Sequence, residues 1–151
     1  MRVLPDPDGR GIHGPSTPYA SSVWLPVLGP TGFLLWSRLS TVARGSGTVG
    51  PEQLCADLGL GRAEGKQSAL ARTLRRLEVF QIARPTGEAT LLVCTELDWV
   101  PDRHLRRLHP AVVHRHRRFL EQSTRAASPT VLDLRPTTDA DPAPVNAPRS
   151  A

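Results

Sequence analysis

Apolar residues recur at helical spacing near the middle of the chain. Leu70, Leu74 and Leu77 stand at positions i, i+4 and i+7, so this segment predicts a helix that buries one leucine stripe. At about 100° per residue, the opposite side carries small and basic residues: Ser68, Arg72 and Arg75. One side of this helix therefore suits a core, and the other is available to a partner.

Two more helices are expected before it. The first opens at Gly29-Pro30-Thr31 and ends before Gly45. Its apolar positions are Phe33, Leu35, Trp36, Leu39 and Val42. The second spans residues 50–58, and Gly59 ends it because glycine readily takes the left-handed conformation. Between them, Thr48-Val49 is a candidate for a short strand.

A β-hairpin and a C-terminal helix are expected after the arginine-bearing helix. Apolar and β-branched residues fill 79–84 and 89–95, and Pro85-Thr86-Gly87-Glu88 between them favours a turn. The second run is apolar almost throughout, which predicts that both its faces are covered, with the C-terminal helix as a candidate cover. That helix starts near Asp102 and is expected to kink or restart at Pro110. Its apolar stripe, which runs to about Gln122, consists of Val112, Val113, His116, Phe119 and Leu120.

The two ends of the chain lack such periodicity. Residues 1–20, rich in Pro and Gly, predict a disordered arm, and residues 22–28 a short extended segment. The tail of residues 123–151 also predicts disorder. Order is therefore expected in residues 21–122, as one α+β, mostly helical domain in which Trp24 and Trp36 anchor the core.

The positive charge is concentrated in the second half of this domain. The net charge is +5, yet residues 1–60 balance at 4 basic and 4 acidic groups, whereas residues 61–125 carry 13 basic and 7 acidic groups. Such an excess favours an anionic partner. GC-rich coding also produces arginine in place of lysine, so the placement of these residues says more than their number. Without a membrane-spanning run or a signal peptide, a cytoplasmic location is expected.

Catalytic or metal-binding side chains do not gather in a recognisable pattern. Cys55 and Cys94 each lie in an apolar pattern, which favours buried thiols over a disulfide. Successive histidines are five, five and two residues apart, unlike ligands on one helical face: His104, His109, His114 and His116. His116, on the apolar stripe, is expected at a core or an interface. Neither an enzyme, nor a cofactor, nor a metal is expected.

The order of helix, short strand, helix, turn, helix and hairpin resembles that of winged-helix domains. The segment Gln53-Leu54-Cys55-Ala56-Asp57-Leu58-Gly59-Leu60 resembles the helix-turn of that superfamily, and Leu70-Ala71-Arg72-Thr73-Leu74-Arg75-Arg76-Leu77 resembles its recognition helix. Gln81-Ile82 stands where many members have Gly-Leu, so the link into the wing is expected to differ. Residues 24–30 and 34–39 are similar to the opening of winged-helix domains in bacterial primosomal and plasmid replication proteins.

The resemblance implies that the arginine-bearing helix enters the major groove of double-stranded DNA. Arg72 and Arg75 would pair with guanine, and Arg84 beside the wing would reach a phosphate or the minor groove. Near the helix N-terminus, phosphates would be held by Lys66, Gln67 and Ser68. Arg76, which lies beside the arginine face, completes the expected DNA-binding set. A second basic surface is expected on the C-terminal helix: Arg103, Arg106, Arg107, Arg115, Arg117 and Arg118. Solvated charges on an exposed face are the simpler alternative.

The expected function is double-stranded DNA binding by one winged helix-turn-helix domain, as in a bacterial transcriptional regulator. The C-terminal helix would pack on the wing or pair with a second copy in a homodimer, and neither a small-molecule effector nor a membrane contact is expected. The alternative is a winged-helix protein-interaction module or an accessory factor in DNA replication, which requires exposed apolar residues on the C-terminal helix. A third hypothesis gives the surface from Arg103 to Arg118 an RNA-binding or structural role.

Overall fold

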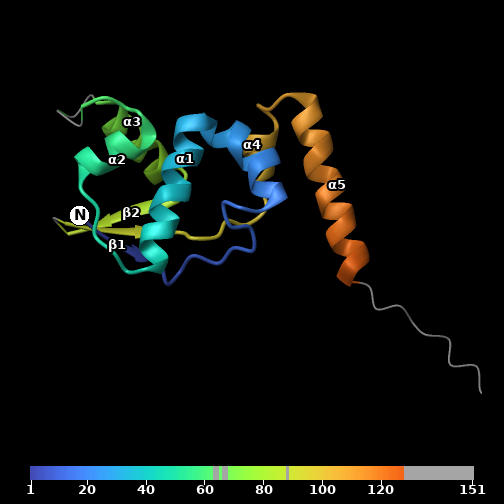
Figure 1. The fold of residues 1–151 in the computed structure, drawn as a ribbon. Helices are drawn as coiled ribbons and strands as arrows, with labels where there is room; N and C mark the ends of the chain where they lie inside the picture. Colours follow the sequence, from blue (N-terminus) through green and yellow to red (C-terminus); the bar gives the residue numbers. More distant parts are fainter. Residues whose placement is uncertain (63–64, 66–67, 88, 128–151) are drawn as a thin grey trace, which may run out of the picture.

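The computed structural model of the chain describes residues 1–62, 65, 68–87 and 89–127. Its elements, in chain order, are the strand β1 (Arg2–Pro5), the π-helix η1 (Ala20–Trp24), the helices α1 (Leu25–Arg44), α2 (Pro51–Leu58) and α3 (Ala69–Val79), the strands β2 (Ala83–Thr86) and β3 (Thr90–Val93), and the helices α4 (Asp102–Leu105) and α5 (Pro110–Ala127). The expected class, α+β and mostly helical, is confirmed (Figure 1). Within the described residues, no helix is both long enough and apolar enough to cross a membrane.

The helix α1 contains a break at the position where the sequence predicted its start. Gly29 has a φ of 75° and a ψ of 161°, outside the helical region, and the helix continues from Pro30 to Arg44. Residues 22–28, expected to be extended, are instead helical in η1 and the first turn of α1. The reason is that the buried residues of this stretch repeat at helical spacing: Ala20, Val23, Trp24, Val27 and Leu28.

The turn after α2 follows the prediction. Gly59 has a φ of 64° and takes the left-handed conformation at the end of the helix. The N–H of Leu60 donates to the carbonyl of Cys55 at 2.9 Å, and the Leu60 side chain packs half-buried against the core. This bond satisfies a carbonyl that the end of the helix would leave unpaired.

The link after α3 has the same hydrogen-bond pattern, so the expectation that Gln81 would change it is wrong. Gln81 has a φ of 59°, and its N–H donates to the carbonyl of Glu78 at 2.8 Å. The next N–H, that of Ile82, donates to the carbonyl of Leu77 at 2.9 Å. Leu77 and Ile82 are both buried in the core. Their burial stabilises the link, although the left-handed backbone conformation is unfavourable for Gln81.

The sheet has the strand order β1-β3-β2, with β1 parallel and β2 antiparallel to β3. The expected hairpin is confirmed, although its strands are shorter because residues 79–82 complete α3 and its link. Ala83 pairs with Val93, and the expected strand at Thr48-Val49 is reduced to one bridge between Thr48 and Arg2. Leu91 and Val93 on one face of β3 are buried, whereas Thr90 and Leu92 on the other face are half-buried, so the prediction that both faces are covered is fully met on one face only.

The N-terminal arm, expected to be disordered, is part of the domain. Val3 is fully buried and pairs with Leu91, and its N–H donates to the carbonyl of Gly47 at 2.9 Å. Further along, His13 and Leu97 exchange backbone hydrogen bonds of 3.0 and 2.9 Å. The prediction failed because each partner lies far away in the sequence, so the pairing leaves no local pattern.

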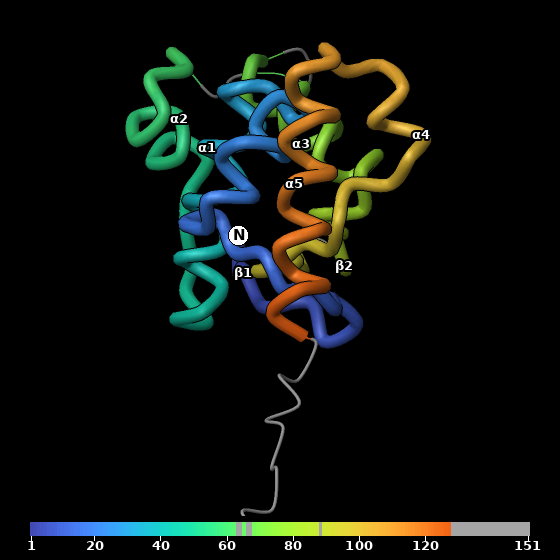
Figure 2. The backbone as a smooth tube through the Cα atoms, turned by 90° about the vertical axis from the view of Figure 1, so that its right-hand side faces the viewer, coloured from blue at the N-terminus to red at the C-terminus, as the bar shows by residue number. Residues whose placement is uncertain are grey.

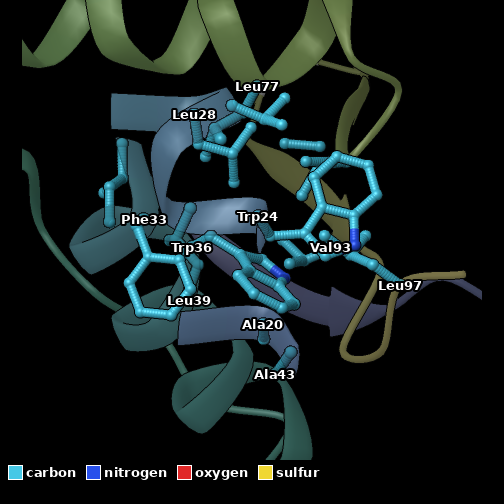
Figure 3. Packing of buried hydrophobic residues seen from close by; sticks show 14 of the residues in the cluster. Ala20, Trp24, Leu28, Phe33, Trp36, Leu39, Ala43, Leu77, Val93 and Leu97 are labelled. Carbon is cyan, nitrogen blue, oxygen red and sulfur yellow. The ribbon is translucent and has the colours of Figure 1, made fainter. Parts of the chain in front are cut away.

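The core lies between α1, α3 and the sheet (Figure 3). Both tryptophans anchor it, as expected. Trp36 is fully buried and its indole N–H donates to the carbonyl of Cys94 at 2.7 Å, while that of Trp24 donates to the carbonyl of Asp98 at 2.9 Å. Cys55 and Cys94 are free thiols as expected, but only Cys55 is fully buried.

The C-terminal helix restarts at Pro110, one of the two outcomes expected there. It runs to Ala127, so residues 123–127, expected to be disordered, are helical. Residues 128–151, the rest of the tail that was expected to be disordered, lie outside the described residues. α5 packs on η1 and not on the wing (Figure 2), and His116 is buried in that contact as the apolar stripe predicted.

Candidate nucleic-acid interface

The outer side of α3 carries the two arginines that the sequence assigned to base recognition. Leu70 and Leu77 are buried beneath the helix, so its inward side was predicted correctly. Arg72 and Arg75 are exposed, and neither guanidinium has an ion-pair or hydrogen-bond partner among the described residues. Guanidinium groups held on a helix without an internal partner can bind a base edge or an anion.

Arg72 also borders a cavity of about 390 Å³ between α3 and the break in α1. Gly29, Pro30, Thr31 and Arg76 lie along the same cavity. The N-terminal end of a helix favours negative charge because its N–H groups point outwards there. The cavity therefore places two arginines beside a helix start, an arrangement that suits a phosphate group.

The residues just before α3 were expected to hold phosphates. Ser68 is instead the N-cap of the helix, and its Oγ accepts the N–H of Ala71 at 3.2 Å. This bond occupies one of the N–H groups at the start of the helix that could otherwise bind a phosphate. The Ser68 side chain is therefore engaged in capping α3. Lys66 and Gln67 lie outside the described residues.

Arg76 is exposed like the other arginines of α3, but its guanidinium has partners within the chain. Its Nη2 donates to the carbonyl of Val27 at 2.8 Å, and its guanidinium lies 5.8 Å from the centroid of the Phe80 ring. Val27 belongs to the first turn of α1, before the break. Arg76 therefore fastens α3 to that turn, and DNA contact would require it to leave this carbonyl.

Arg84, beside the wing turn, is paired within the chain. Its Nη2 lies 3.0 Å from Asp6 Oδ1 and 3.3 Å from Asp8 Oδ2. The hydrogen bond with Asp8 and the charge of Asp6 raise the pKa of Arg84 above its usual value. The N-terminal arm thus holds the arginine that was expected to reach DNA, and both carboxylates were missed because they lie in the segment predicted to be disordered.

The expected second basic surface is present on α4, α5 and their link, and all six of its arginines are exposed. None of them forms an ion pair with a described residue. Figure 1 shows α2 and α3 on one side of α1 and α5 on the other. α3 and α5 therefore do not present one continuous surface, whereas α4 adjoins the end of α3, where the centroid of the His104 ring lies 4.8 Å from that of the Phe80 ring.

A cluster of aromatic rings and histidines joins α5 to the N-terminal arm. The Tyr19 hydroxyl lies 2.7 Å from His116 Nδ1 and accepts the N–H of Val100 at 2.9 Å. The ring centroids of His13 and Trp99 lie 4.2 and 4.6 Å from that of Tyr19. Of these residues, the sequence indicated the burial of His116 alone, since Tyr19 and His13 stand among prolines and glycines.

Burial sets the charge state of this cluster. It lowers the pKa of His116, an effect that Asp102 opposes and Arg117 reinforces. It also lowers the pKa of His13, whose Nε2 is buried without a hydrogen-bond partner among the described residues. Burial raises the pKa of Tyr19 to about 12. All three side chains are therefore uncharged near neutral pH.

In the part of the chain that the structure describes, no group of three or more His, Cys, Asp and Glu side chains is placed to hold a metal ion. Comparison with protein-family models, curated proteins and solved structures finds no match for this chain. Function is therefore inferred from the fold and from the side chains that α3 presents.

Proposed function

We propose that this chain binds double-stranded DNA through α3, as a winged helix-turn-helix domain. One observation carries the proposal: the outward guanidinium groups of Arg72 and Arg75 have no partner among the described residues, while the leucine side of the same helix is buried. α3 follows α2 after the ten residues 59–68, and it precedes the β2–β3 hairpin. In helix-turn-helix proteins, the helix at this position enters the major groove.

The sheet departs from the expected order in one respect. The strand that flanks β3 opposite β2 comes from the N-terminus, and the segment between α1 and α2 contributes the single bridge at Thr48. β1 pairs with the edge of β3 that the expected strand at Thr48-Val49 would otherwise occupy. A three-stranded sheet therefore still supports the hairpin that would act as the wing.

The chemistry of the two outward arginines suits DNA. A guanidinium fork matches O6 and N7 of guanine, a contact worth about 1–3 kcal/mol of discrimination against the wrong base. Arg72, beside the start of the straight part of α1, is equally placed to hold a phosphate. Arg76 and Arg84 contribute less in this proposal, because each would first leave an internal partner.

The role proposed for this activity is that of a bacterial transcriptional regulator in the cytoplasm, with a homodimer as its simplest symmetric form. An accessory factor in DNA replication is the alternative, and it would use the same side of α3. Sequencing of the genomic fragments that co-purify with the tagged protein separates the two roles. A regulator recovers a small set of promoter sites, whereas a replication factor recovers an origin.

Fluorescence anisotropy of the full chain with a labelled duplex tests DNA binding itself. If three phosphates are neutralised, the affinity is expected to fall by about 40-fold between about 50 and 200 mM salt. Arg72→Ala and Arg75→Ala should each weaken binding by about tenfold. Arg125→Ala removes the same charge from the last turn of α5 and should change affinity less than about twofold. Equal affinities for all four proteins would refute the assignment to α3.

A further inference from the structure

A groove of about 690 Å³ runs between α4 and α5. Besides the exposed Pro110, four apolar side chains line it, of which Leu105 is buried and the other three are half-buried: Leu105, Leu108, Val113 and Leu120. The apolar surface therefore continues from the core outwards into the groove. Arg106 and His114, both exposed, stand along the same groove.

α5 has two neighbouring faces with different surroundings. One face packs on η1 and the core and consists of Val112, His116 and Phe119. The other lies about 100° further round the helix and lines the groove: Val113, Arg117 and Leu120. Positions i, i+4 and i+7 of the groove face therefore read apolar, basic, apolar, with Arg117 exposed between two half-buried side chains.

The positive charge of α4, α5 and their link is not balanced by negative charge among the described residues of this region. From residue 102 to residue 127 the sequence has seven arginines and two carboxylates, Asp102 and Glu121. None of the arginines on the second basic surface forms an ion pair with a described residue. At the groove itself, Arg106 and Arg117 stand against one carboxylate, that of Asp102, so the rim carries a net positive charge. A net positive rim around an apolar floor selects a partner that combines negative charge with apolar side chains.

Charge and shape together distinguish the candidate occupants. A symmetric dimer through this face would bring two surfaces of the same net positive charge together, and like charges at an interface repel. A nucleic-acid backbone would pair with the rim but leave Leu108, Val113 and Leu120 uncovered. An amphipathic helix with acidic and apolar residues meets both requirements, since such helices lay an apolar face into a groove.

We propose that the groove between α4 and α5 docks an acidic amphipathic helix of a partner protein, with an acidic side chain of that helix paired to Arg117. The partner helix would carry apolar residues at positions i and i+7 and the acid at i+4, complementary to the face of α5. The site is separate from the arginines proposed to bind DNA, because Arg72 and Arg75 do not line the groove and stay open when it is occupied.

A synthetic peptide tests this site on the full chain. The probe is a labelled helical peptide of about 18 residues, or five turns, with Leu at i and i+7 and Glu at i+4, and its twin has Lys in place of Glu. Anisotropy should show that the wild type binds the Glu peptide and that Arg117→Glu binds it at least about tenfold more weakly. Arg118→Glu is the matched control, since it makes the same charge change one position along, outside the groove, and should lose less than about threefold.

A charge exchange completes the test. Arg117→Glu should bind the Lys peptide more tightly than the wild type does, whereas a merely unfolded variant would bind neither. Unchanged duplex DNA binding and circular dichroism of Arg117→Glu confirm that its fold is intact. Equal losses in Arg117→Glu and Arg118→Glu, no binding of the Glu peptide by the wild type, or displacement of that peptide by an unlabelled duplex would each overturn the proposal.

Discussion

The Tyr19 hydroxyl joins three parts of the domain that are distant in sequence. It accepts the N–H of Val100 and donates to His116 Nδ1, and both bonds are buried. In this arrangement the Val100 N–H, the hydroxyl hydrogen of Tyr19 and His116 Nδ1 all have a partner. If Nδ1 carried the hydrogen and donated it, the hydroxyl hydrogen would have no acceptor among the described residues. Tyr19→Phe keeps the ring and removes the oxygen, so it isolates the contribution of these two bonds.

The expected cost of Tyr19→Phe follows from what it leaves behind. The Val100 N–H and His116 Nδ1 would both stay buried without a partner, and each such group costs about 1–3 kcal/mol. We therefore expect the free energy of unfolding to fall by about 2–6 kcal/mol. That is a large share of the roughly 5–15 kcal/mol by which a domain of this kind is stable.

Urea unfolding followed by tryptophan fluorescence measures this loss. The midpoint should move to lower urea with little change in slope, because the surface exposed on unfolding is the same. Phe119→Leu is a suitable control, since it changes another ring that packs on Tyr19 but breaks no hydrogen bond. A loss in Tyr19→Phe of less than about 0.5 kcal/mol, as for an ordinary surface substitution, would refute the shared hydroxyl.

The same cluster predicts how stability depends on pH. Burial lowers the pKa values of His116 and His13 in the folded state below the value of about 6.5 in the unfolded chain. The unfolded state therefore binds protons first as pH falls. The unfolding free energy should be highest above about pH 6.5 and should decline below it, by at most about 1.4 kcal/mol per pH unit for each histidine, until the folded pKa values are passed. His116→Gln, which keeps an acceptor for the hydroxyl, should decline less steeply.

Three further predictions concern other parts of the chain. Gln81→Gly should raise the unfolding free energy by about 0.5–1 kcal/mol in urea titrations, because glycine takes the left-handed conformation without strain, and a loss would contradict the cap described after α3. Asp8→Asn should raise duplex affinity up to about fivefold by loosening the hold on Arg84, whereas Glu121→Gln, with the same charge change on α5, should not. Val3→Ala should lower the unfolding free energy by about 1.5–3 kcal/mol, and a neutral result would mean that β1 is not part of the core.

Local patterns predicted the part of the fold that local physics specifies. The leucine stripe of α3, the left-handed Gly59 and the Pro110 break each depend on neighbours within a few residues, and each is found in the structure. β1 escaped prediction because Val3 is held by Leu91, a partner at the far end of the domain. A four-residue strand is too short to show a period of its own.

The candidate site likewise has one part that local patterns predict and another that they do not. The outward direction of Arg72 and Arg75 follows from helical geometry, so the sequence was sufficient to predict it. Arg76 and Arg84 lie on the expected elements, but their side chains bind groups contributed by the first turn of α1 and by the N-terminal arm. Such pairings depend on how distant segments meet, and a pattern of residue types along the chain does not contain that information.

Selection of duplexes from a random library is the most direct test of the claim that α3 reads DNA. The wild type should enrich a shared sequence that contains guanine, and Arg72→Ala or Arg75→Ala should lose the preference at one or two base pairs while the rest of the sequence is kept. An identical enriched sequence from the wild type and both variants, or no enrichment by the wild type, would contradict the account.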